Sequence, residues 1–273
     1  MTLIPEIKPQ QSLELLKELH ILTREGKINQ DTRRKLKQVY HLYQFIEPLM
    51  QTVLDERQAL SLVDHGAGKS YLGFILYDLF LKEHDSATVY GIESRADLVR
   101  KSEDLAQRLG FAGMQFKDMT VEQSISSTDL PEKIDIVTAL HACNTATDDA
   151  IRFALARDAR FIVLVPCCQA EVAAALRATK GNTLGKTPLS ELWRHPLHTR
   201  EFGSQITNVL RCLQLEARGY QVTVTELVGW EHSMKNELII AKKTGGFKKS
   251  ARERQLAILK ECHLEALEER FAY

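Results

Sequence analysis

Three acidic residues stand at positions where a ligand could meet them. Asp64, Glu93 and Asp118 each come last in a short segment with the composition of a buried strand. A carboxylate accepts hydrogen bonds from the hydroxyl and amino groups of a bound molecule. One acid at the end of a strand is ordinary, but three in succession behind a glycine turn indicate a shared binding site.

A histidine and three cysteines form a second group of residues that could take part in a reaction or bind a metal. His141 and Cys143 follow the fourth predicted strand, and Cys167 and Cys168 follow the fifth. If these strands are neighbours, all four side chains approach one edge of the sheet. Three interpretations stay open: an imidazole or thiolate that takes part in a reaction, a soft-metal site, and packing of small polarizable side chains. Adjacent cysteines suit tetrahedral coordination poorly and no C-x-x-C is present, so we predict no metal, with His141 as the best-placed general base.

The glycine turn that follows Asp64 reads Asp-His-Gly-Ala-Gly-Lys-Ser and leads from a strand into a helix. A phosphate-binding P-loop needs a glycine where Val63 stands, and a dinucleotide fingerprint needs one at Tyr71. Two interpretations are left: the acid-x-Gly-x-Gly turn of proteins that bind S-adenosyl-L-methionine (SAM), formed with Gly66 and Gly68, and a turn that binds no ligand. Glycine is needed where a chain bends sharply or a ligand comes close to the backbone.

The elements that position these residues alternate between strand and helix. The predicted strands cover 60–64, 88–93, 114–118, 134–140 and 160–166, and the predicted helices between them include 70–82, a helix capped by Ser94 and ended by Gly110, and 147–158. This alternation is typical of a parallel sheet covered on both faces. Segments 220–228 and 237–243 have no room for a crossover helix between them and must pair antiparallel.

Helices are also predicted on both sides of this region. They cover 11–26, a segment from Asn29 or Asp31 to the neighbourhood of Pro48, 207–218 and 248–270. We therefore predict an α/β chain in three parts: an N-terminal helical extension (1–54), a domain that would bind SAM (55–245) and a C-terminal helix (246–273). Segment 180–200, rich in glycine and proline and containing His195 and His198, is predicted as a loop over the pocket, a candidate substrate lid.

Residues 55–243 resemble the class I SAM-dependent methyltransferases, through the turn and the three acids. The resemblance implies a Rossmann-like sheet, mostly parallel, whose last strand is antiparallel. It implies that Asp64, Gly66 and Gly68 surround the methionine part of SAM and that Glu93 binds its ribose. The remaining cofactor contacts that it implies are Asp118 and Met119 at the adenine and Leu140 at the end of the fourth strand.

Four pieces carry a narrower resemblance. They are 64–72, Leu-His-Ala-Cys-Asn at 140–144, Val-Pro-Cys-Cys at 165–168 and Glu-His-Ser-Met-Lys-Asn at 231–236. They are similar to a methyltransferase subfamily that includes a eukaryotic tRNA ribose methyltransferase and methyltransferase-like proteins. Those proteins usually show glycine where Asn144 stands, and the zinc-finger spacing of the tRNA enzyme is absent here. The resemblance makes RNA the first acceptor to expect, with a protein or a small molecule as alternatives.

Composition limits the remaining choices. The 273 residues include 36 basic and 36 acidic ones, so net charge favours no polyanion, although basic residues gather at 33–37 and 242–254. No apolar run is long enough to span a bilayer, the first residues lack the features of a signal peptide, and five cysteines suit reduced thiols. We therefore expect a cytoplasmic protein without a membrane partner. The rival functions are a non-catalytic protein that binds SAM or a nucleotide and acts through a partner, and a phosphotransferase, against which Val63 argues.

Overall fold

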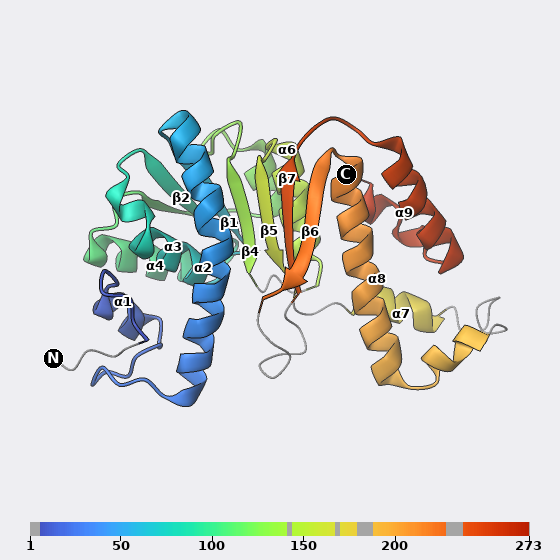
Figure 1. The fold of residues 1–273 in the computed structure, drawn as a ribbon, viewed down its shortest axis with the longest axis horizontal. Coiled ribbons are helices and arrows are strands. Elements are labelled where there is room, and N and C mark those ends of the chain that lie inside the picture. Colours follow the sequence, from blue (N-terminus) through green and yellow to red (C-terminus); the bar gives the residue numbers. More distant parts are fainter. Residues whose placement is uncertain (1–5, 141–143, 167–169, 179–187, 228–236, 273) are drawn as a thin grey trace.

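The computed structural model describes residues 6–140, 144–166, 170–178, 188–227 and 237–272, and these form a sheet flanked by helices (Figure 1). Seven strands of this part of the chain pair in the order β3-β2-β1-β4-β5-β7-β6. They are β1 Leu60–His65, β2 Ala87–Glu93, β3 Met114–Asp118, β4 Ile136–Leu140, β5 Phe161–Val165, β6 Tyr220–Glu226 and β7 Glu237–Lys243. Strand β7 pairs antiparallel with both β5 and β6, and the other pairs are parallel. The predicted Rossmann-like sheet is confirmed.

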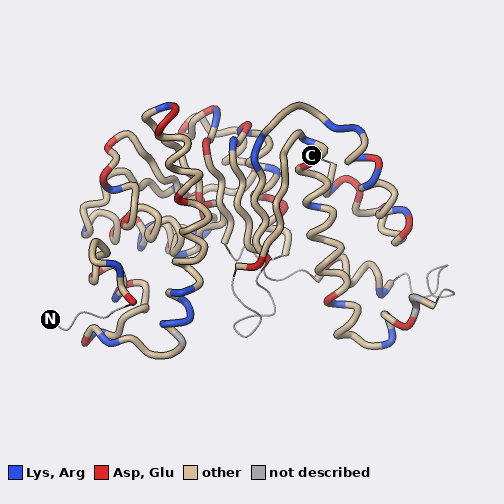
Figure 2. The backbone as a smooth tube through the Cα atoms, in the orientation of Figure 1, with Lys and Arg blue, Asp and Glu red and all other residues tan. Residues whose placement is uncertain are grey.

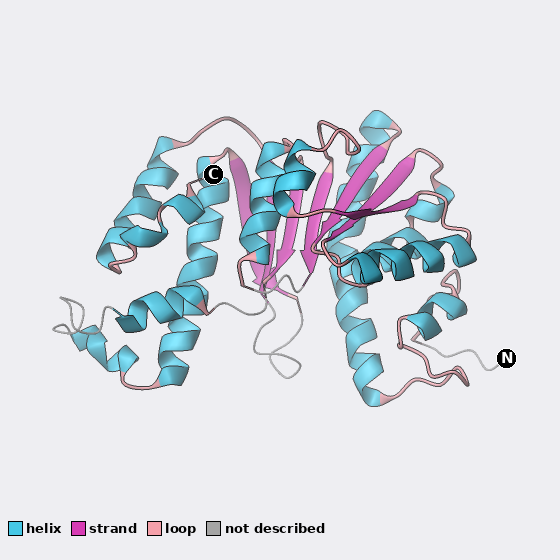
Figure 3. Ribbon diagram, turned by 180° about the vertical axis from the view of Figure 1, so that it is seen from behind, coloured by secondary structure: helices cyan, strands magenta, loops and turns pink. Residues whose placement is uncertain are grey.

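Helices cover both faces of this sheet, as the opposite views of Figures 1 and 3 show. They are α1 Leu13–Glu18, α2 Gln30–Arg57, α3 Tyr71–Leu79, α4 Ala96–Leu109, α5 Val121–Ser126, α6 Ala146–Ala156, α7 Glu171–Ala178, α8 Pro196–Ala217 and α9 Lys249–Glu261, with 3-10 turns at Leu81–Glu83, Pro188–Trp193, Glu265–Leu267 and Glu269–Phe271. Apolar residues of α2, α3 and α4 share one core with the sheet, and residues of α6 and α8 share another.

Alternation along the central strands explains how one sheet builds two cores. In β5, Val163 and Val165 belong to the core on the side of α2, whereas Ile162 and Leu164 belong to the core on the side of α6. Successive side chains of a strand point to opposite faces, so a strand buried on both sides is apolar throughout. The carboxyl ends of the parallel strands lie on one common edge of the sheet.

That edge contains the point where strand order changes direction. Strand β1 lies between β2 and β4, so the connections from β1 and from β4 leave toward opposite sides of the sheet. Ligands of open α/β sheets bind at such a switch point, beyond the carboxyl ends of the strands. In Figure 1 these ends lie at the bottom of the sheet, and the N-terminal half of α2 extends past them.

Several predicted boundaries were wrong. Pro48 lies inside α2, which continues to Arg57 and runs through the predicted boundary after residue 54. The missing hydrogen bond at proline is outweighed because Ile46, Met50 and Val53, on both sides of it, are fully buried. The domain division itself stays a prediction.

The predicted cap of α4 was wrong as well. Arg95 rather than Ser94 precedes the helix, and its side chain makes no capping hydrogen bond; the predicted end of this helix at Gly110 is confirmed. The predicted C-terminal helix stops at Glu261, because His263 takes a left-handed φ of 52° and the chain continues in 3-10 turns. Helices α5 and α7 are short and were not predicted.

Helix α8 begins at Pro196, well before the predicted Thr207, with proline in its first turn where the missing N–H costs nothing. The region expected to form a lid is therefore largely helical over 188–200, and 179–187 lie outside the described residues. His195 and His198 are exposed, with ring centroids 5.2 Å apart in an edge-to-face arrangement. No helix in the described part of the chain is long and apolar enough to cross a membrane.

Candidate functional site

The turn after β1 is built from left-handed residues. Gly66, Gly68 and Ser70 have φ of 67°, 59° and 47°, and α3 begins one residue later. L-residues other than glycine adopt this region at a cost, which explains both glycines. A Cβ placed on Gly66 would meet no atom within 4 Å, so the turn has open space on its outer side. A ligand can approach the backbone there.

Asp64 supports this turn from inside the protein. The residue is only 2% exposed, and its carboxylate accepts hydrogen bonds from the hydroxyls of Ser70 and Thr138, each at 3.1 Å. Burial raises its pKa to about 6, although these donors and the Gly73 amide oppose that shift. Ser70 is thus the donor that ties the turn to Asp64, a contact that no sequence pattern indicates.

Glu93, at the end of β2, has the opposite electrostatic setting. Its carboxylate accepts hydrogen bonds from the Gly68 N–H at 2.9 Å and from the backbone and guanidinium of Arg95. Arg95 is the main reason why the pKa of Glu93 lies below its usual value. Glu93 is therefore an ionised acceptor hydrogen-bonded directly to the glycine turn.

The other predicted cofactor contacts lie along the same edge. Asp118 pairs with Glu93 in the register of β2 and β3 and is exposed, while the half-buried Met119 donates its N–H to the Glu93 carbonyl at 3.2 Å. Leu140 is half-buried at the carboxyl end of β4. The structure thus brings the three acids to one edge, with Asp64 facing inward and Asp118 facing solvent. Their roles in binding stay predictions.

His65 was quoted in the sequence only as part of the glycine motif. It is 5% exposed, its ring lies 5.1 Å from that of Phe153, and neither ring nitrogen has a hydrogen-bond partner among the described residues. Burial lowers its pKa to about 4, so the imidazole is neutral at pH 7. No sequence signal distinguishes this buried histidine from an exposed one.

The four catalytic candidates, His141, Cys143, Cys167 and Cys168, lie outside the described residues. What is described is where their segments begin. Strands β4 and β5 are parallel neighbours that pair Leu140 with Val165, so both segments start from adjacent points. The four side chains were expected to approach one edge of the sheet only if the fourth and fifth predicted strands are neighbours, and β4 and β5 are neighbours. No group of three potential metal ligands occurs among the residues that the structure describes.

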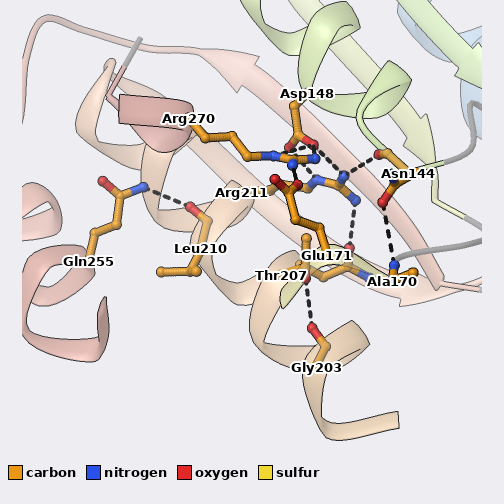
Figure 4. Close-up of polar contacts among 11 residues, drawn as sticks. Asn144, Asp148, Ala170, Glu171, Gly203, Thr207, Leu210, Arg211, Gln255 and Arg270 are labelled. Carbon is orange, nitrogen blue, oxygen red and sulfur yellow. Dashed lines mark hydrogen bonds and ion pairs between the residues drawn. The ribbon is translucent and has the colours of Figure 1, made fainter. Parts of the chain in front are cut away.

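A polar network fixes the far ends of these two segments (Figure 4). Asn144 has a left-handed φ of 54°, and its side-chain oxygen accepts from the Ala170 N–H at 3.4 Å. Its carbonyl accepts from Arg211, a fully buried residue that also makes two hydrogen bonds to Asp148 at 2.7 and 2.8 Å. Arg270, near the C-terminus, pairs with the same carboxylate. Helices α6, α7 and α8 are thereby joined beside the carboxyl edge.

The fold defines the class of this protein: a parallel sheet with one antiparallel strand, and a glycine turn at its switch point. Residues 34–175, just over half of the 273 residues, match a family described as "Methyltransferase domain", and the chain belongs to this family. The prediction of a methyltransferase is confirmed at that level. SAM, the predicted cofactor, is the methyl donor of methyltransferases with this fold.

Solved structures similar to this chain share little sequence with it. Magnesium protoporphyrin IX methyltransferase from Synechocystis PCC 6803, with bound SAH, is 16% identical with a TM-score of 0.47, over 86% of this chain and 96% of that one. A putative caffeoyl-CoA O-methyltransferase from Staphylococcus aureus is 10% identical with a TM-score of 0.46, over 86% and 93%. A putative O-methyltransferase from Klebsiella pneumoniae is 12% identical with a TM-score of 0.47, over 85% and 88%. No curated protein matches the chain.

Proposed function

We propose that this protein transfers the methyl group of SAM to RNA. The observation that carries the cofactor assignment is the hydrogen bond from Gly68 N–H to the Glu93 carboxylate, 2.9 Å long, at the switch point of the sheet. It places an ionised acceptor directly beside a turn with open space. A ribose with two neighbouring hydroxyls is a ligand that such an acceptor recognises.

The residues present fit the cofactor. When bound, SAM supplies a methyl group on a positively charged sulfur, which is already activated for transfer. Glu93 accepts hydrogen bonds from the ribose hydroxyls, and Asp118, exposed on the next strand, accepts from the adenine amine. Asp64 holds the turn through Ser70, so that the backbone at Gly66 stays open to the ligand. His141 is the proposed base for the acceptor proton.

The acceptor proposal is supported by the charge on α2. Arg33, Arg34, Lys35 and Lys37 are exposed on the half of this helix that extends past the carboxyl edge (Figure 2). Phosphates bind such cations and release counterions on binding. Arg33 lies 2.9 Å from a Glu6 carboxylate oxygen, so part of the positive charge is already compensated. The narrower resemblance to a subfamily with a tRNA ribose methyltransferase also favours RNA.

The second basic stretch, 242–254, contributes less to this proposal. It begins with the last two residues of β7, at the amino ends of the parallel strands, and continues into α9, at the opposite end of the sheet from the carboxyl edge (Figure 2). Lys243 pairs with Asp158, and Arg254 donates to Glu216 at 2.7 Å. An RNA that reaches the carboxyl edge therefore meets α2 rather than this stretch.

Calorimetry with S-adenosylhomocysteine (SAH) tests the cofactor assignment. Glu93→Ala should weaken binding by a few kcal/mol at most, as expected for the loss of charge-assisted hydrogen bonds to the ribose. Asp64→Ala should weaken binding indirectly, because the turn loses the carboxylate that accepts from Ser70. Asp104→Ala is the matched control, because Asp104 is an exposed acid on α4 away from the turn. Unchanged affinity in both folded variants would show that the turn does not bind the cofactor.

Transfer of labelled methyl from SAM into cell extract, separated into RNA, protein and small-molecule fractions, tests the acceptor. We expect label in RNA, and RNA binding that falls steeply as salt rises. Lys35→Gln with Lys37→Gln should weaken that binding and reduce its dependence on salt. Label in another fraction would assign a protein or a small molecule as the acceptor, and no label at all would favour the non-catalytic alternative. The cytoplasmic location stays a prediction.

A further inference from the structure

All acceptor positions of the Glu93 carboxylate are used. Oε1 accepts from the backbone N–H of Arg95 at 3.1 Å and from its Nε at 3.0 Å. Oε2 accepts from the Gly68 N–H at 2.9 Å and from Nη2 of Arg95 at 3.0 Å. A carboxylate has about four lone-pair sites, so four donors saturate it. Two of these donors are backbone groups that remain whatever residue stands at position 95, and the other two belong to the arginine side chain.

The guanidinium of Arg95 lies on the side from which a ligand approaches. A Cβ placed on Gly68 would lie 3.8 Å from Nη2 of Arg95, so the guanidinium extends over the glycine turn. The Arg95 side chain is 63% exposed, whereas the Glu93 side chain beneath it is 9% exposed. The arginine therefore separates the carboxylate from solvent, and it can turn away without unpacking a core.

We propose that Arg95 determines the affinity of the cofactor site by occupying, in the free protein, the two acceptor positions of Glu93 that the ribose hydroxyls take. This inference rests on the proposed function, because it requires a ribose at Glu93. Two hydroxyls donate two hydrogen bonds, the same number that Nε and Nη2 of Arg95 donate. Binding is thus an exchange in which the guanidinium leaves the carboxylate and the ribose replaces it.

In this exchange, the free energy needed to break the internal ion pair between Arg95 and Glu93 reduces the net free energy of cofactor binding. Exposed ion pairs are weak, and a bidentate arginine lies at the stronger end of their range, so removing the competitor should tighten binding about two- to tenfold. Lysine keeps the charge but cannot donate two parallel hydrogen bonds. The affinity of Arg95→Lys for the cofactor should therefore lie between those of the wild type and Arg95→Gln.

The test is calorimetric titration of the full chain with SAH. We expect Arg95→Gln to bind SAH about two- to tenfold more tightly than the wild type, at an unchanged melting temperature. Arg100→Gln is the matched control, since Arg100 is an exposed arginine on α4, the helix that follows Arg95, and it should leave affinity unchanged. Equal or weaker binding by Arg95→Gln, or an equal gain in Arg100→Gln, overturns the inference. Absence of SAH binding by the wild type overturns the proposed function itself.

A second comparison tests whether Arg95 acts through Glu93. In the Glu93→Gln background, Arg95→Gln should give no further gain, because the pair is already broken. With small probes, the gain from Arg95→Gln should be larger for adenosine than for 2′-deoxyadenosine, which has lost one of the two hydroxyls. A gain that persists without Glu93, or that is equal for both nucleosides, shows a general charge effect and overturns the exchange.

Discussion

Replacement of Arg211 by methionine should destabilise the protein more than replacement of Arg270, the other arginine that pairs with Asp148. The Arg211 side chain is 0% exposed and that of Asp148 is 8% exposed, so the two charges are held almost completely away from water. Methionine fills a similar volume without charge or hydrogen bonds. It removes two hydrogen bonds to Asp148, one to the Asn144 carbonyl and one to the side-chain oxygen of Asn208.

The expected loss of stability follows from the Asp148 charge that remains buried when Arg211 is replaced. Removing one partner of a buried ion pair costs about 3–5 kcal/mol, because the other charge stays buried without compensation. Asp148 keeps Arg270, so the expected loss lies at the lower end, about 3 kcal/mol. The side chain of Arg270 is 15% exposed, so Arg270→Met leaves the better-buried pair intact and should cost about 1–2 kcal/mol.

Urea unfolding at pH 7, followed by far-UV circular dichroism, measures both losses. The double variant Arg211→Met with Asp148→Leu removes both buried charges, and it should be less destabilised than the sum of its single changes by about 1–3 kcal/mol. The reasoning is refuted if Arg211→Met costs less than about 1 kcal/mol, or if Arg270→Met costs more than Arg211→Met.

Two further predictions concern the glycine turn and the sheet below it. The pKa of Asp64 is about 6 in the folded protein against 3.8 for a free aspartate, so the folded state keeps its proton to higher pH. Stability relative to Asp64→Asn should therefore fall, by about 3 kcal/mol, as pH rises from about 4 to above 6, measured by urea unfolding across that range; a flat difference contradicts the assignment. A Cβ on Gly91 would lie 2.6 Å from the Phe116 ring, so Gly91→Ala should cost about 1–3 kcal/mol through overpacking. Gly110→Ala, with φ of 69° and no neighbour within 4 Å, should cost only about 1 kcal/mol of backbone strain, and the reverse order of melting temperatures would contradict the steric argument.

The strands and their acids were predictable because their signals are local. An apolar segment that ends in an acid and a glycine turn locates Asp64, and the next two strands locate Glu93 and Asp118 in the same way. The antiparallel pairing of β6 and β7 follows from the short connection between them. In these cases the pattern within about ten residues already decides the structure.

The contacts that complete the site were not predictable, because each depends on residues far apart in the chain. Thr138 meets Asp64 only when β4 lies beside β1, and Arg211 meets Asp148 across 63 positions. The helix through Pro48 survives because buried neighbours outweigh the local preference of proline. No sequence pattern distinguishes Arg95 from other residues that follow a strand, and the position of its guanidinium is known only from the folded turn.

The position of β7 between β5 and β6 restricts the order in which the strands can pair while the chain is being synthesised. Strand β6 leaves the ribosome before β7, yet it has no strand to pair with until β7 exists, because β7 is its only neighbour among the described strands. Domains tend to fold from the N-terminus during synthesis. Strands β1 to β5 can therefore assemble while the backbone of β6 is still unpaired. The two last strands then join the sheet together, as a hairpin whose second arm contacts β5. The side of the molecule that includes α8 and α9 should therefore fold last and open first, and native-state hydrogen exchange should show β6 less protected than β1.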